Sequence, residues 1–99
     1  MAKRLEGKVV FLTGAGAGIA KATAKMCSRE GAGVAICELN REAGERAERE
    51  IREAGGNALF VHADVTDDTS VRDAVAAAAK HFGTINVLFN CAGGSSQDD

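Results

Sequence analysis

Four strand-length apolar runs alternate with three longer segments of helical spacing, and this alternation constrains the fold more than any other feature. The runs lie at residues 9–12, 34–37, 58–61 and 85–89. None alternates cleanly between apolar and polar residues, as expected for strands that are covered on both faces. Strands that alternate with helices of this length predict parallel strands joined by right-handed crossovers. The sequence therefore predicts one α/β domain over residues 1–99, with the order β-α-β-α-β-α-β.

The three segments between these runs carry apolar residues at helical spacing. The first spans about residues 18–30, the second follows Asn40 as a plausible N-cap, and the third begins near Thr66 and Asp67. Glycines at 31, at 55 and 56, and at 83 are expected to end them. The stripes expected to be buried are Ile19, Ala22, Met26 and Cys27; Ala43, Ala47, Ile51 and Ala54; and Val71, Val75, Ala78, Ala79 and Phe82.

Composition and charge argue against several classes of function. The formal net charge is −2, and the basic residues are scattered among acids, which is not typical of a nucleic-acid-binding protein. No apolar run approaches the ~18 residues needed to span a membrane, and the first residues lack the apolar core of a signal peptide. We therefore expect a cytoplasmic protein. Cys27, Cys37 and Cys91, like His62 and His81, lack metal-ligand spacing, so no metal site is predicted.

A glycine-rich turn, Thr13-Gly14-Ala15-Gly16-Ala17-Gly18-Ile19-Ala20, joins the first run to the first helical segment. Glycines there allow a tight turn, and the N–H groups at the helix start favour an anion such as pyrophosphate. The alternative is a turn of small residues that serves only close packing of strand and helix. A P-loop is excluded because Lys21 lies between two alanines. The Gly-x-Gly-x-x-Gly pattern also fails, because Ile19 and Lys21 occupy the positions of its third glycine.

An acidic residue, Glu38, ends the second run at the distance expected of a dinucleotide site, about 20 residues after the turn. A carboxylate there can accept hydrogen bonds from both hydroxyls of the adenosine ribose. Its charge would repel a 2′-phosphate, so NAD is favoured over NADP, although nearby Arg41 would soften this preference. The alternative is that Glu38 is a solvated residue at a strand end.

The turn fits Thr-Gly-x-x-x-Gly-x-(Gly/Ala), and the fourth run ends in Asn90-Cys91-Ala92-Gly93. In these features the chain resembles the short-chain dehydrogenase/reductase family, over residues 5–93. Ala20 and Cys91 stand where the family usually has glycine and a second asparagine. The resemblance implies a Rossmann-type parallel sheet, here partial, with the strand order 3-2-1-4.

The resemblance also implies which residues bind the cofactor. Asp64 would meet the adenine amino group and Val65 would lie along the ring, while small residues after Asn90 would let the backbone pass close to the ribose. On local sequence, capping of the third helix by Asp64, Thr66 or Asp67 is an equal alternative. The predicted cofactor-binding residues are Thr13, Gly14, Gly16, Gly18, Ile19, Glu38, Asp64, Val65, Asn90, Ala92 and Gly93.

The family transfers hydride between nicotinamide and the carbon of a carbonyl or alcohol substrate. Its Tyr-x-x-x-Lys pair lies beyond the fourth strand, and this chain has no Tyr. No catalytic residue is therefore assigned, and the chain looks like the cofactor-binding, amino-terminal part of a longer oxidoreductase, inactive alone and a homo-oligomer when complete.

Two other functions stay open. A methyltransferase that uses S-adenosylmethionine also has a turn like Gly14-x-Gly16-x-Gly18, although Thr13 stands where an acid is more usual there. A nucleotide-binding module without catalysis is the second. Binding of NADH or of S-adenosylmethionine separates the enzyme classes.

The strand order implied by the resemblance predicts an exposed apolar edge at residues 87–89, because the fourth strand is then outermost. Such an edge is a template for pairing with other chains. We expect the chain to self-associate and to unfold without a sharp transition. Sedimentation velocity and thermal unfolding followed by circular dichroism test this, and a cooperative transition of a monomer would contradict it.

Overall fold

The computed structural model describes residues 4–14, 18–64 and 66–90. Its elements follow the predicted order, and their ends lie within two residues of those expected. The strands are β1 (Val9–Thr13), β2 (Gly33–Glu38), β3 (Asn57–His62) and β4 (Val87–Asn90). The helices are α1 (Gly18–Arg29), α2 (Arg41–Glu53) and α3 (Asp68–Phe82).

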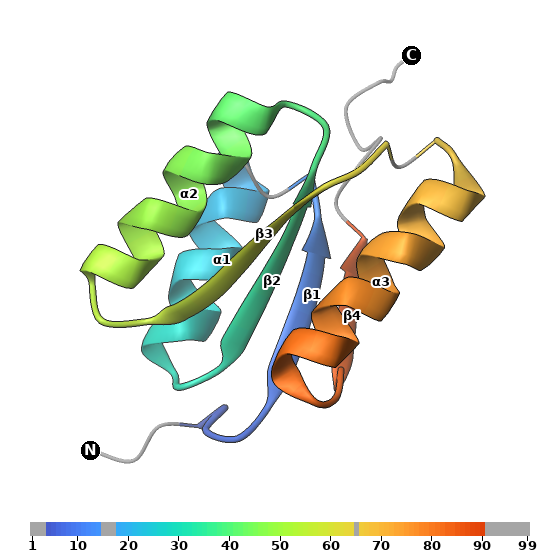
Figure 1. Cartoon of the computed structure of the whole chain (residues 1–99). Helices are drawn as coiled ribbons and strands as arrows, with labels where there is room; N and C mark the ends of the chain where they lie inside the picture. The colour runs from blue at the N-terminus through green and yellow to red at the C-terminus, as the bar shows by residue number, and fades with distance from the viewer. Residues whose placement is uncertain (1–3, 15–17, 65, 91–99) are drawn as a thin grey trace.

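The strands form one parallel sheet in the order β3-β2-β1-β4, which confirms the predicted topology. Figure 1 shows α1 and α2 over one face of this sheet and α3 over the other, so the chain has three layers. Val9 of β1 lies opposite Gly33 of β2, which in turn lies opposite Asn57 of β3. All crossovers return to the same end of the sheet, so the loops that follow the strands share one edge.

The core consists of two hydrophobic clusters, one on each face of the sheet. Successive side chains of a strand point to opposite faces, so β1 and β2 contribute to both clusters. Val10 and Leu12 of β1 face α1 and α2, whereas Phe11 packs with alanines of α3. Every residue of β1 is buried, as predicted for a strand covered on both sides.

The stripe predicted for the first helix is wrong at three of its four positions. Ile19 is 86% exposed and Met26 is 59% exposed, and Ala22 is exposed as well. Alanine lets a helix backbone approach a sheet more closely than larger side chains allow, so the small residues of α1 take the inner positions. The residues of α1 that face the core are Ala20, Ala24 and Cys27.

The stripes of the other two helices are confirmed in part. Ala47 and Ile51 of α2 and Ala78 of α3 are buried. Five further predicted residues are half-buried: Ala43, Val71, Val75, Ala79 and Phe82. The predicted Ala54 is exposed instead, because it is the C-cap of α2 and lies beyond the last turn that packs on the sheet. Gly44, which the pattern did not predict, takes a buried position on α2.

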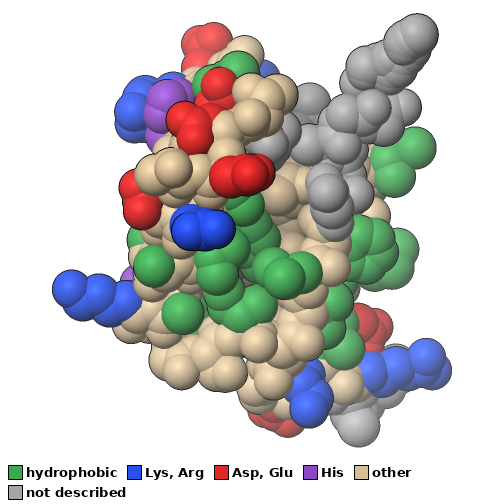
Figure 2. Space-filling view, turned by 90° about the vertical axis from the view of Figure 1, so that its right-hand side faces the viewer, with side chains coloured by type: hydrophobic (Ala, Val, Ile, Leu, Met, Phe, Trp, Pro, Cys, Tyr) green, Lys and Arg blue, Asp and Glu red, His purple; other side chains and the backbone are tan. Residues whose placement is uncertain are grey.

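The predicted apolar edge is exposed. β4 is the outermost strand on its side, with Val87, Leu88 and Phe89 exposed by 39%, 66% and 46%. Figure 2, which turns the right-hand side of Figure 1 toward the viewer, shows hydrophobic side chains gathered on this side of the molecule. Self-association through this edge stays a prediction.

Within the residues that the structure describes, no helix is both long enough and apolar enough to cross a membrane.

Because α2 lies close to β3, we expect the Gly44→Ala substitution to destabilise the protein. A Cβ at Gly44 would overlap the ring of Phe60. Alanine in a helix normally gains up to ~1 kcal/mol over glycine, but overpacking costs about 1–3 kcal/mol, so we expect a net loss of stability. Urea unfolding measures this loss, and the exposed Glu45→Ala serves as control, with a change within about 0.5 kcal/mol. A more stable Gly44→Ala variant would contradict the packing described.

Candidate cofactor-binding site

The predicted polar residues gather at the carboxyl edge of the sheet. Thr13, the last residue of β1, lies opposite Cys37 of β2 and opposite Asn90 of β4. Glu38, one residue further along β2, lies opposite His62 of β3. The segments that follow these strands therefore begin side by side, at the edge where ligands of parallel α/β sheets bind.

The glycine turn leaves β1 through a backbone conformation that favours glycine. Gly14 has φ +69° and Gly18 has φ +67°, both in the left-handed region. The Gly14 N–H donates to the carbonyl of Cys37 at 2.7 Å, which extends the sheet and occupies this amide. Any amide of the turn that donates to a bound anion would therefore have to follow Gly14. Gly16 lies outside the described residues.

The start of α1 differs from the starts of the other two helices. Its first turn holds no acidic residue, whereas α2 has Glu42 and α3 has Asp68 in theirs. The side chain of Ile19, the second residue of α1, is 86% exposed beside the turn. A helix start without a negative side chain fits an anion, because the dipole and the first N–H groups favour negative charge there. Thr13, by contrast, is only 7% exposed.

The carboxylate of Glu38 is held at the rim of this edge. Glu38 is half-buried, and its Oε2 accepts a hydrogen bond from the backbone N–H of Asn40 at 3.0 Å. The side chain of Asn40 accepts from the N–H of Ala43 at 3.0 Å, so Asn40 is the N-cap of α2, as predicted. Leu39, between them, is exposed and apolar. The start of α2 thus fixes the backbone beside Glu38.

The structure decides between the alternative caps of α3. Asp67 is the N-cap, and its carboxylate accepts from the N–H groups of Thr69 and Ser70 at 2.9 and 3.3 Å. The Oδ1 of Asp64 instead accepts from the hydroxyl and the N–H of Thr66, at 2.6 and 2.9 Å. Asp64 is therefore not occupied as a cap.

These bonds also hold Asp64 in its charged form. The Thr66 hydroxyl, followed by the Thr66 N–H, lowers the pKa of Asp64, because both groups donate to the carboxylate. The backbone N–H of Asp64 donates to the hydroxyl of Ser70 at 2.9 Å. The sequence prediction missed Thr66 and Ser70 in these roles. The Asp-x-Thr spacing signals such a turn, but the contact with Ser70 depends on where α3 begins.

The remaining predicted residues are less fully described. Asn90 pairs through its backbone with Thr13 at the end of β4. Val65, Ala92 and Gly93 lie outside the described residues.

Metal-ligating residues do not cluster in the part of the chain that the structure describes: no group of three or more His, Cys, Asp or Glu side chains there could hold a metal ion. Burial, followed by the charge of neighbouring Glu38, raises the pKa of Cys37 to about 11. This thiol therefore stays protonated at neutral pH and is a poor nucleophile.

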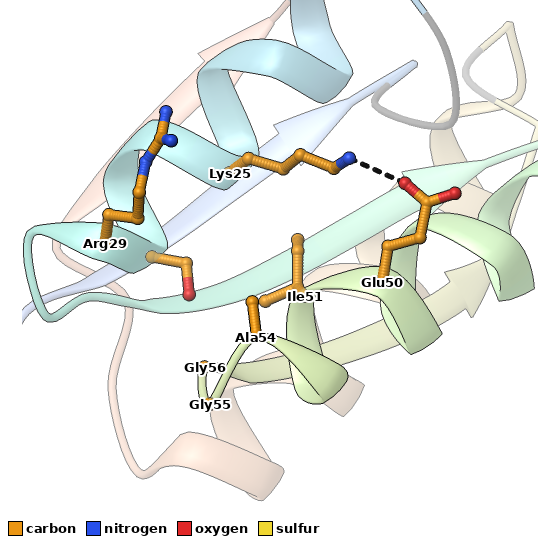
Figure 3. A pocket seen from close by; sticks show the side chains of 8 residues that line it. Lys25, Arg29, Glu50, Ile51, Ala54, Gly55 and Gly56 are labelled. Carbon is orange, nitrogen blue, oxygen red and sulfur yellow. Dashed lines mark ion pairs between the residues drawn. The ribbon is translucent and has the colours of Figure 1, made fainter.

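A hollow of about 280 Å³ lies between α1 and α2, and none of the predicted site residues lines it. Figure 3 shows Lys25 of α1 reaching toward Glu50 of α2 across it. The Glu50 Oε1 lies 2.6 Å from the Nζ of Lys25 and 2.9 Å from the Nζ of Lys21. Hydrogen bonds from Lys25 and then Lys21 lower the pKa of Glu50 to about 2. These contacts link the two helices at the surface.

Comparison with known proteins points to one family. The family model described as short chain dehydrogenase matches residues 8–99. A 2,5-dichloro-2,5-cyclohexadiene-1,4-diol dehydrogenase of Sphingobium indicum is 48% identical over 93 residues, which are 94% of this chain and 37% of the relative. Secoisolariciresinol dehydrogenase of Forsythia intermedia is 38% identical over 94% of this chain and 33% of its own length.

Solved structures agree with this comparison. The structure of NAD⁺-bound xylitol dehydrogenase superposes with a TM-score of 0.88 and 43% identity, over 92% of this chain and 35% of that protein. The chain therefore spans about a third of the length of the proteins that it matches.

The hydrogen bond from Thr66 predicts the effect of a Thr66→Val substitution. Valine keeps the shape of the side chain but lacks the hydroxyl, so only the backbone N–H of residue 66 still donates to Asp64. The pKa of Asp64 is therefore expected to rise part of the way toward the ordinary value of an aspartate. Carboxyl-carbon NMR titration measures this rise. Thr69→Val, at an exposed position in α3, is the control and should leave the Asp64 titration unchanged. An unshifted Asp64 in Thr66→Val would refute this account of its pKa.

Proposed function

The chain belongs to the short-chain dehydrogenase family, and from this premise we propose that its glycine-rich turn and Glu38 bind NAD as the cofactor-binding part of an oxidoreductase. One observation carries the proposal. The left-handed glycines at the start of α1 and the Glu38 carboxylate at the end of neighbouring β2 lie at the same edge of the sheet. A dinucleotide carries its pyrophosphate next to the adenosine ribose, the two groups that these features would bind.

The pyrophosphate is assigned to the start of α1. Gly14 turns the chain away from the sheet, and Gly18 begins the helix with a conformation that few other residues adopt. The turn amides after Gly14, including that of Gly16, would donate to the phosphate oxygens. Buried Thr13 would position the turn, and the exposed Ile19 side chain would lie along the bound group.

The adenosine ribose is assigned to Glu38. Its carboxylate would accept hydrogen bonds from both ribose hydroxyls, while the Asn40 N–H holds one of its oxygens in place. A 2′-phosphate at the same position would meet this negative charge, so we propose NAD in preference to NADP. A similar protein of known structure, xylitol dehydrogenase, was solved with NAD⁺ bound.

The adenine is assigned to the loop after β3. Asp64, held ionised by Thr66, would accept from the adenine amino group, and Val65 would lie along the ring. The strand end at Asn90, with Ala92 and Gly93, would pass close to the ribose.

When bound, NAD would accept or donate hydride for a small alcohol or carbonyl substrate. No residue of this chain is assigned a catalytic role; its own residues bind and orient the cofactor. We also propose that the protein acts in the cytoplasm and as a homo-oligomer.

Titration of the chain with NADH, followed by calorimetry, tests the proposal. We expect NADH to bind and S-adenosylmethionine not to bind. Glu38→Ala is expected to weaken NADH binding about tenfold or more, because hydrogen bonds to a charged group contribute about 1.5–3 kcal/mol each. The same substitution should narrow the preference for NADH over NADPH, because the repulsive charge is removed.

Glu42→Ala is the matched control, since it removes the same charge from the first turn of α2. It should change the affinity for NADH little. The proposal fails if NADH does not bind to the folded chain, or if Glu38→Ala binds it as tightly as the unchanged chain does.

A further inference from the structure

The strand β3 forms the second edge of the sheet, opposite β4. The outward-facing N–H and C=O groups of an edge strand are a template for pairing with another strand. Along β3, the backbone groups of Ala58 and Phe60 point away from β2 and toward side chains of α2. What occupies these groups therefore decides whether β3 can accept a further strand.

Two charged side chains of α2 occupy them. The Oε2 of Glu48 accepts from the backbone N–H of Phe60 at 2.7 Å. The Nε of Arg52 donates to the backbone carbonyl of Ala58 at 3.0 Å. Both bonds are partly buried, and each has one charged partner, which makes such bonds stronger than those between neutral groups.

The two side chains act as a unit. Glu48 and Arg52 lie one turn apart on α2, and the Arg52 Nη2 is 3.9 Å from the Glu48 Oε2. The Glu48 carboxylate accepts from the N–H of Phe60, and the Arg52 guanidinium donates to the C=O of Ala58. An incoming strand would otherwise pair with these two backbone groups. Each charge also lies beside its opposite, so neither is left uncompensated at the edge.

The packing of α2 explains why these side chains reach the edge. Ala47 and Ile51, on the inner face of α2, are buried in the core shared with Ala58. Gly44 has no side chain, and the ring of Phe60 lies where a Cβ would stand. The axis of α2 therefore lies close to β3, within the reach of Glu48 and Arg52.

We propose that Glu48 and Arg52 form an edge clamp that closes β3 against pairing with a strand of a second copy of this chain. A strand that adds to β3 must accept from the Phe60 N–H and donate to the Ala58 carbonyl, and both groups are already bonded. It would have to displace two charged side chains that are hydrogen-bonded to the strand. Neither Glu48 nor Arg52 is among the residues assigned to the cofactor, so the test of the clamp needs no NADH.

A labelled peptide with the β3 sequence, residues 57–62 between added lysines for solubility, is the probe. Fluorescence anisotropy measures its binding to the 99-residue chain. The clamp predicts that the double variant Glu48→Ala/Arg52→Ala binds this peptide at least tenfold more tightly than the unchanged chain does. Binding at the β4 edge contributes equally to both, so the difference reports on β3.

Two further variants make the comparison decisive. Glu48→Gln/Arg52→Lys keeps an acceptor and a donor and should restore weak binding of the peptide. Glu45→Ala/Arg49→Ala removes the same residue types at the same spacing from exposed positions of α2 and should bind like the unchanged chain. The proposal is overturned if Glu48→Ala/Arg52→Ala binds the peptide no more tightly than the unchanged chain does. It is also overturned if Glu45→Ala/Arg49→Ala gains as much affinity for the peptide as Glu48→Ala/Arg52→Ala.

Hydrogen exchange gives a second test that needs no alanine variant to fold. In the unchanged chain, the clamp predicts that the Phe60 amide exchanges at least tenfold more slowly than an unprotected amide. Exchange of this amide at the unprotected rate overturns the clamp.

Discussion

The pairing of β1 on both sides is the constraint on which the rest of the structure depends. All five residues of β1 are buried, and the strand lies between β2 and β4 in register. Because the pairing is parallel, the ends of β1 and its neighbours fall at one edge. The glycine turn leaves from the middle of that edge, with Glu38 on one side and Asn90 on the other. A slip of one residue in β1 would turn its side chains to the wrong faces and move the turn away from Glu38.

The three helix starts at this edge differ in the negative charge that they place at the positive end of the helix dipole. Asn40 and Asp67 cap α2 and α3 through their own side chains. Their first turns also carry acidic residues, whereas that of α1 has none. The first turns of α2 and α3 thus carry their own negative charge, whereas that of α1 carries none among the residues from Gly18 on. This difference, together with the glycines, supports the phosphate site proposed for α1.

The order of elements could be predicted because buried parallel strands and glycine-ended helices leave strong signals in the sequence. The stripe of α1 could not, because the inner residues Ala20 and Ala24 are less hydrophobic than the exposed Ile19 and Met26. The sequence also could not show whether Asp64 or Asp67 caps α3, since either residue type is a good N-cap. The residue at which α3 begins decides which of them is the cap. The position of the glycine turn and of Glu38 at one edge of the sheet was predictable from their spacing along the chain.

The contacts of α2 could not be predicted from the sequence, because they depend on distances between elements. Gly44 meets Phe60, Glu48 and Arg52 reach the edge of β3, and Glu50 bonds the lysines of α1. Each joins residues that no local pattern relates. Together they fix α2 along its length, against β3 from Gly44 to Arg52 and against α1 at Glu50. Asn40, whose N–H holds the carboxylate of Glu38, is the first residue of this fixed unit. The geometry of the proposed ribose site therefore rests on the packing of a whole helix and not on its connecting turn alone.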